Sequence, residues 1–167
     1  MLAILAFFSG YPLIYAFTMT VSGVMPITNP FKKRLTAALP YSYALVGTLY
    51  LGLQLKNTYL NYSYGNVRQM LLHPYLLFWA FLSLLFWIPA VNRRKAFSLC
   101  HSLVFFFFFA KDILTQLFGA SADKELQKND LRIFTVSLLL NLGTLLLVVI
   151  LQFLPAQTKR KQGDSLL

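Results

Sequence analysis

Charged residues are scarce in this sequence. Only 12% of its 167 residues are Asp, Glu, Lys or Arg, about half of the share that soluble domains usually carry. Such a shortage leaves too little polar side-chain area to cover a water-soluble globule. Apolar residues take their place, since 57% of the chain is hydrophobic and the mean hydropathy is +0.61. We therefore expect a membrane protein whose surface is largely covered by lipid.

Groups that could carry catalysis or bind a metal are also few. The single cysteine, Cys100, excludes an intramolecular disulfide and a site built from several thiolates. The chain has no HExxH motif, no paired-cysteine motif and no phosphate-binding glycine loop. Its two histidines, His73 and His101, are expected at different depths in the bilayer, which argues against a haem iron bound by both. The sequence therefore predicts no metal and no cofactor, and it favours a protein that is not an enzyme.

Positive charge is the exception to this scarcity. Lys and Arg number 15 against 5 Asp and Glu, which gives a net charge of +10. In a soluble protein this excess would suggest a nucleic-acid partner. Here most of the basic residues form short clusters beside apolar runs, where they orient helices and meet anionic headgroups. We expect the lipid bilayer as the partner and no nucleic acid.

Apolar runs of about the length that crosses a bilayer follow one another along the chain. They cover residues 1–25, 36–55, 74–91, 96–118 and 131–154. Gly10 and Pro12 are expected to bend the first run. The sequence thus predicts an all-α polytopic integral membrane helix bundle of five transmembrane helices. This bundle forms a single domain, residues 1–158, and is followed by a basic, flexible cytoplasmic tail, residues 159–167.

The basic clusters predict the orientation of the helices. Segments 32–34, 93–95 and 159–161 each consist of three Lys or Arg residues directly beside an apolar run. An N-terminus outside and a C-terminus inside would place all three clusters on the cytoplasmic side, as the positive-inside rule requires. The other six basic residues are scattered, and several of them have acidic neighbours. The predicted topology is therefore N-out, C-in.

Two features of the connections bear on location. Residues 57–73 are rich in tyrosine and predict either a short interfacial helix or an ordinary loop on the outer side. Asn61 begins a glycosylation tripeptide there, which has meaning only in a host that glycosylates. The short connections favour a bacterial inner (cytoplasmic) membrane, with a eukaryotic endomembrane as the alternative.

Small residues predict how the first two spans pack. Ala44, Thr48 and Gly52 recur every four positions in the second span, so they share one face. Residues of this size let membrane helices approach closely. We expect this stripe to contact the similar stripe of Ala3, Ala6 and Gly10 in the first span.

Polar residues in the fourth and fifth spans form the candidate site. His101 and Asp112 lie near one stripe of the fourth span, with Lys111 beside Asp112. The fifth span carries Ser137, Asn141 and Thr144 on one face. Buried ionisable groups often mark ion paths, and histidine changes charge near neutral pH. The structural alternative is that Asn141 holds helices together and that His101 donates to a carbonyl or serine of a neighbouring helix.

Three functions are compatible with these observations. The leading hypothesis is a non-enzymatic subunit, scaffold or assembly partner that binds other membrane-protein subunits or copies of itself. The alternative is a small ion, proton or solute transporter or channel that uses a polar seam between helices four and five. A weaker alternative is a lipid-modifying enzyme with its acidic residues at Asp123, Glu125 and Asp130.

Overall fold

The computed structural model describes residues 2–26, 29–60, 74–118 and 124–164, and nearly all of them are helical. No strand occurs in these ranges, which confirms the all-α class. The elements, in chain order, are α1 (Leu2–Phe8), α2 (Tyr11–Val24), α3 (Pro30–Leu60), α5 (Pro74–Leu82), the 3₁₀ helix η1 (Ser83–Trp87), α6 (Pro89–Asn92), α7 (Lys95–Phe118) and α8 (Lys124–Asp164).

Three stretches among the described residues are helical, long and apolar enough to cross a membrane. They are Ile4–Val24 in α1 and α2, Lys95–Thr115 in α7 and Leu131–Gln152 in α8. A shorter apolar helix covers Pro74–Trp87. By length and composition these stretches have the character of a helical membrane protein, while the count of five spans stays a prediction.

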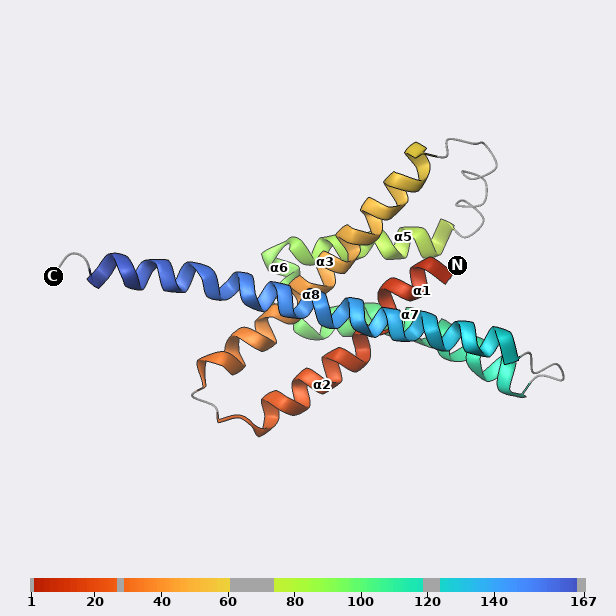
Figure 1. The fold of residues 1–167 in the computed structure, drawn as a ribbon, viewed down its shortest axis with the longest axis horizontal. Coiled ribbons are helices and arrows are strands. Elements are labelled where there is room, and N and C mark those ends of the chain that lie inside the picture. The colour runs from red at the N-terminus through yellow and green to blue at the C-terminus, as the bar shows by residue number, and fades with distance from the viewer. Residues whose placement is uncertain (1, 27–28, 61–73, 119–123, 165–167) are drawn as a thin grey trace.

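The helix ends gather at two sides of the molecule (Figure 1). One side holds the end of α2, the start of α3, the short helix α6 and the end of α8. The opposite side holds the N-terminus, the end of α3, the starts of α5 and α8 and the end of α7. Consecutive long helices therefore run in alternating directions.

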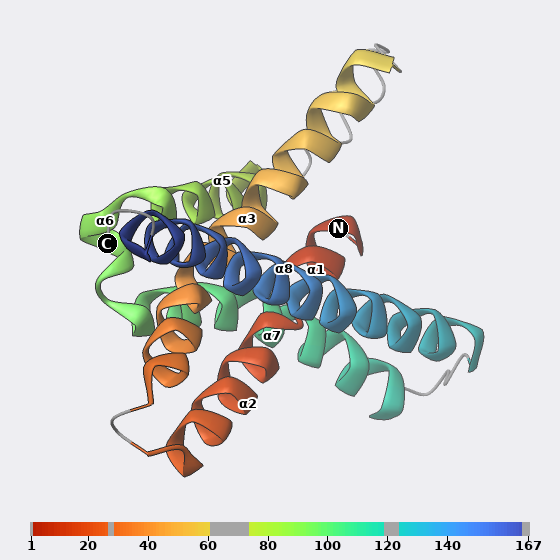
Figure 2. The ribbon, with the colours of Figure 1, turned by 60° about the vertical axis from the view of Figure 1, so that its left-hand side comes forward.

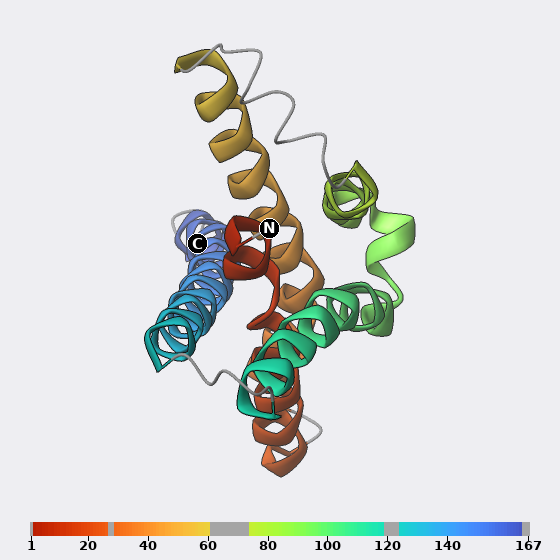
Figure 3. The ribbon, with the colours of Figure 1, turned by 90° about the vertical axis from the view of Figure 1, so that its right-hand side faces the viewer.

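α5, α7 and α8 run roughly along one axis, and α2 and α3 are inclined to it (Figure 1). α8 passes over the middle of α3, and the two helices contact each other there (Figure 2). α1 lies between α8 and α3 in the perpendicular view (Figure 3), and it contacts both. The N-terminal helix is thus the element around which the longer helices meet.

Aromatic side chains fill the centre of the fold. Phe8 stacks on Phe105 with ring centroids 4.7 Å apart, and it meets Tyr43 and Tyr50 edge to face. All four side chains are buried. Offset stacking and edge-to-face contacts are the arrangements that aromatic rings prefer. α1, α3 and α7 are joined through this cluster.

The first apolar run is two helices and not one. α1 ends at Phe8 and α2 begins at Tyr11, with Ser9 and Gly10 between them. Pro12 follows at the start of α2, where proline is tolerated because the first amide groups of a helix have no helical partner. The expected bend is therefore a break at Gly10.

The stripe of small residues predicted in the second span differs from the observed contact. Ala44 is buried, but Thr48 and Gly52 are exposed, and a Cβ added to Gly52 would meet nothing within 4 Å. The close contact is made at Gly47, where an added Cβ would overlap the hydroxyl of Ser83 in η1. The nearest neighbours of Gly10 are backbone atoms of Ser137 and Leu138 in α8.

The last helix is longer than predicted. α8 continues to Asp164, so its backbone is helical through most of the segment 159–167. The cytoplasmic location and the flexibility of that segment stay predictions. Most of the connection 57–73, including Asn61 and His73, lies outside the described residues.

Candidate functional site

His101 is the polar centre of the fold, and its side chain joins three elements. Its Nε2 lies 2.8 Å from the carbonyl oxygen of Trp79 in α5, and its Nδ1 lies 2.6 Å from the hydroxyl of Tyr43 in α3. A carbonyl only accepts, so Nε2 carries the hydrogen. In the neutral ring Nδ1 then accepts the hydroxyl hydrogen of Tyr43. Both ring nitrogens are satisfied inside the protein.

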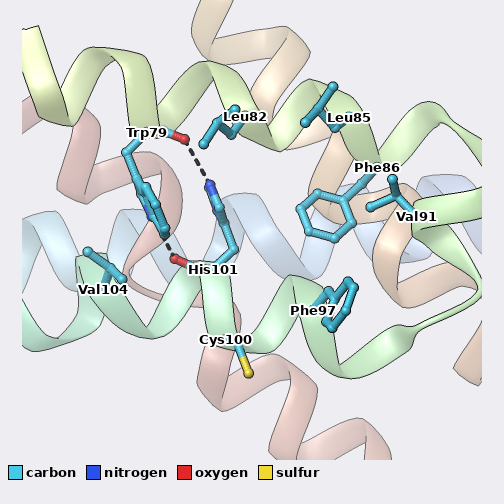
Figure 4. A pocket seen from close by; sticks show the side chains of 9 residues that line it. All are labelled: Trp79, Leu82, Leu85, Phe86, Val91, Phe97, Cys100, His101 and Val104. Atoms are coloured by element: carbon cyan, nitrogen blue, oxygen red, sulfur yellow. Dashed lines mark hydrogen bonds between the residues drawn. The ribbon is translucent and has the colours of Figure 1, made fainter.

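The contact between His101 and Trp79 is reciprocal (Figure 4). The indole Nε1 of Trp79 donates to the backbone carbonyl of His101 at 3.2 Å. The two rings are stacked, with centroids 4.8 Å apart and planes 4° from parallel. Two hydrogen bonds and a stack therefore hold α5 against α7. This arrangement is the structural alternative that the sequence left open for His101, in which the ring donates to a carbonyl of a neighbouring helix.

A second set of bonds joins α7 to the N-terminal helices. Ser98 donates to the carbonyl of Lys95, so Tyr11 donates its hydroxyl hydrogen to Ser98 Oγ at 2.8 Å. Lys95 in turn donates to Thr36 Oγ1 of α3 at 2.9 Å. The start of α7 is thus tied to both α2 and α3.

Asn141 and Ser137 of α8 hold the break between α1 and α2. Gly10 donates its amide hydrogen to Ser137 Oγ at 2.8 Å, and Asn141 Nδ2 donates to the carbonyl of Phe7 at 2.9 Å. An added Cβ on Gly10 would lie 2.8 Å from backbone atoms of Ser137 and Leu138. Glycine is therefore required for this close approach. Backbone groups that the break exposes find partners on α8.

One atom at this contact has no partner within the described part of the chain. Asn141 Oδ1 is buried and accepts no hydrogen bond, although Nδ2 also donates to Ser137 O at 2.8 Å. Rotating the amide by 180° would face its oxygen toward two carbonyls, so the assignment is fixed by the bonds. Asn92 Nδ2 in α6 is the other such atom among the described residues.

His101 does not share its hydrogen-bond partners with Ser137 and Asn141. His101 bonds α3 and α5, whereas Ser137 and Asn141 bond the α1–α2 break. Thr144 donates to the carbonyl of Asn141 within α8. Lys111 is exposed, and Asp112 is half-buried near the end of α7. His101 and the pair Ser137 and Asn141 thus make separate contacts, although α7 and α8 also pack directly through the stacked rings of Phe109 and Phe134. A role of these residues in transport stays a prediction.

An apolar cavity of about 450 Å³ lies beside His101, and the sequence did not predict it. Leu82, Leu85 and Phe86 form one wall, and Phe97, Cys100 and Val104 of α7 form the other (Figure 4). Trp79 and His101 close one end, and Val91 lies at the other. Leu85, Phe97 and Cys100 are exposed, so the cavity is an open groove. No periodic signal marked it, since its residues are as apolar as their neighbours.

The remaining candidates lie outside what the structure describes. The side chains of Glu125 and Asp130 and the whole of Asp123 fall in this category. Within the described residues, no three His, Cys, Asp or Glu side chains are grouped as a metal would require. Comparison with protein-family models, with curated proteins and with solved structures gave no match. The function is therefore argued from the geometry alone.

Proposed function

We propose that this chain is a five-span, N-out, C-in membrane protein that works as a non-enzymatic subunit or assembly partner. The positions of the helix ends support the topology, because basic segments 32–34 and 93–95 belong to the same side of the molecule (Figure 1). The end of α8, which carries residues 159–161, lies on that side too. The short connections favour a bacterial inner membrane.

The observation that carries the function is the contrast between the two faces of α8. One face is polar and buried, with Ser137, Asn141 and Thr144 bonded inside the bundle. The opposite face is apolar and has Gly143 at its centre, with an open space where a Cβ would be. The large exposed side chains around this glycine are Val136, Leu139, Leu146, Leu147 and Ile150.

Such a face suits a second helix. In lipid, apolar side chains alone give little drive for helices to associate, and close approach at a small residue supplies the packing. Gly143 gives no packing advantage inside this chain, because its side-chain position contacts nothing. We assign the outward face of α8 as the surface that meets another membrane helix, from a different subunit or from a second copy.

Gentle detergent extraction of a tagged chain tests this assignment. We expect a stoichiometric partner or a homo-oligomer that Gly143→Leu removes. Gly52→Leu is the matched control, since Gly52 is likewise open and exposed but lies on α3. A lone monomer from mild extraction, or equal loss of the partner in both variants, contradicts the assignment.

A transporter is the second candidate, and one observation favours it. Broken helices with unpaired acceptors are typical of ion sites in transporters, and Asn141 Oδ1 lies unpaired beside the α1–α2 break. Flux of Na⁺, K⁺ or H⁺ into vesicles containing the pure protein tests it. Flux that Asn141→Leu abolishes and Thr135→Ala preserves would favour transport over assembly, because Thr135 is exposed on the same helix.

A further inference from the structure

The groove between the α5–η1 arm and α7 has a basic turn at one end. Its lining residues run from Val91 and Phe97, which flank this turn, to Trp79 and Val104. From Phe97 to Val104 the groove follows about two turns of helix, roughly 10 Å. Arg93 and Arg94 lie in the turn between α6 and α7, and both are exposed. An elongated apolar space thus ends at a turn that carries two exposed arginines.

Arg94 lies against a wall of the groove, and Arg93 precedes it in the same turn, with no acidic residue nearby in sequence. The Arg94 guanidinium lies 5.4 Å from the ring centroid of Phe97, which is itself a wall of the groove. The first 111 residues contain no Asp or Glu, and every acidic residue of the chain comes later. Lys95 is held inward by its bond to Thr36, so the outward charge of the turn is that of the arginines.

We propose that this groove binds an anionic phospholipid, with one acyl chain along the apolar walls and the phosphate beside Arg93 and Arg94. The apolar lining matches a hydrocarbon chain, and the basic end matches a headgroup with net negative charge. A soluble ligand fits poorly, because the lining offers almost no polar group besides the edge of His101, whose nitrogens are already bonded. The inference concerns lipid and needs no protein partner.

The His101–Trp79 pair keeps the groove in shape. Their stacked rings and reciprocal hydrogen bonds join the two walls at the end away from the arginines. At the other end, α6 connects the α5–η1 arm to α7 along the chain. The groove is therefore a preformed space between two connected helices, and lipid entry requires no rearrangement of the fold.

The tryptophans provide a direct measurement. Trp87→Phe leaves Trp79, inside the groove, as the only tryptophan of the chain. This variant is placed in phosphatidylcholine vesicles in which a rising fraction of either phosphatidylglycerol or phosphatidylcholine carries brominated acyl chains, which quench indole fluorescence on contact. We expect brominated phosphatidylglycerol to quench Trp79 at a lower mole fraction than brominated phosphatidylcholine does. The difference should be about fivefold for each arginine that engages the headgroup.

Charge variants distinguish binding of anionic lipid at this groove from a general attraction of anionic lipid to a cationic protein. In the Trp87→Phe background, Arg93→Gln with Arg94→Gln should make the two brominated lipids equivalent. Lys159→Gln with Arg160→Gln removes the same charge elsewhere and should preserve the preference. Equal quenching before any arginine is changed, or the same loss in both double variants, would overturn the proposal.

A third variant tests the place of the acyl chain. Val104→Phe fills the end of the groove next to Trp79, and it should reduce quenching by both brominated lipids while leaving the circular dichroism spectrum unchanged. Undiminished quenching in this variant overturns the assignment of the chain to the groove. If lipid binds as expected but no protein partner is found, the lipid site stands and the assembly function fails.

Discussion

His101 and Asn141 are both buried polar side chains that join helices far apart in sequence, but their surroundings differ. His101 sits among Trp79, Tyr43, Phe86 and Phe105, and both of its nitrogens are bonded. Asn141 sits where a glycine lets two backbones approach, and it keeps one oxygen unpaired. The contact at His101 depends on the packing of large aromatic side chains. The contact at Asn141 depends on Gly10, whose missing side chain lets two backbones approach.

This difference determines which substitutions each contact can accept without a large loss of stability. A glycine contact fails as soon as a Cβ is added, because backbone atoms cannot move aside. An aromatic contact has more atoms that can shift, and its cost arises mainly from polar groups left without partners. The variants below separate the two contacts, with unfolding measured by titration with SDS in mixed micelles.

Gly10→Ala should have the largest effect, a loss of about 3 kcal/mol in the free energy of unfolding. Its Cβ would lie 2.8 Å from backbone atoms of α8, so α1 and α2 must move away from that helix. Gly23→Ala is the control, since a Cβ there meets nothing within 4 Å, and its stability should be unchanged or slightly higher. Similar losses in both variants would contradict the close approach at Gly10.

His101→Phe should lower stability by about 2 kcal/mol, because the Tyr43 hydroxyl and the Trp79 carbonyl lose their partner while ring packing is largely kept. Adding Tyr43→Phe removes one of these orphaned groups. The double-mutant cycle should therefore show a coupling of about 1 kcal/mol between the two residues. Purely additive losses would mean that the hydrogen bond contributes nothing.

Asn141→Leu should cost less than His101→Phe, about 1 kcal/mol. The variant removes two donated bonds, each worth about 0.6 kcal/mol on average between membrane helices, but it also removes the unpaired oxygen. The same SDS titration measures it. A loss larger than that of His101→Phe would reverse the ranking of the two contacts.

Trp87→Phe should have the smallest effect, about 0.5 kcal/mol. The indole of Trp87 is 46% exposed and donates a single bond to Thr48, and exposed bonds of this kind contribute little. This variant also validates the fluorescence background used for the lipid measurement. A loss of stability comparable to that of His101→Phe would show that Trp87 is part of the core.

The sequence could predict the helical class and the break at Gly10, because apolar runs and a Gly–x–Pro pattern have direct physical meaning. It could not predict which face of a membrane helix is buried. In water, polarity marks the outside, but in lipid both faces are apolar, so Gly47 and Gly52 look equivalent although only Gly47 makes a close contact. For the same reason, the sequence could not predict which apolar residues line the groove beside His101.

The polar residues show a similar limit. Ser137 and Asn141 were identified as one face of a helix, which the structure supports through their shared contact with the α1–α2 break. Because neighbouring spans run antiparallel and place Asp112 and Ser137 at similar depth, the sequence predicts the preceding helix as their partner. In the structure these residues bond backbone groups beside the break at Gly10, and hydropathy does not show which backbone groups a break leaves free.

The 3₁₀ segment η1 also changes the reach of the shortest apolar arm. A 3₁₀ helix rises about 2.0 Å per residue against about 1.5 Å in an α-helix, so Pro74–Trp87 extends to about 23 Å. That length is several ångströms short of the hydrocarbon thickness of an average bilayer, about 30 Å. In the five-span topology that we propose, the bilayer next to this arm would thin or the arm would sit off-centre. The spans in α7 and α8, with 21 and 22 residues, match the average thickness, so only the lipid next to this arm has to adapt.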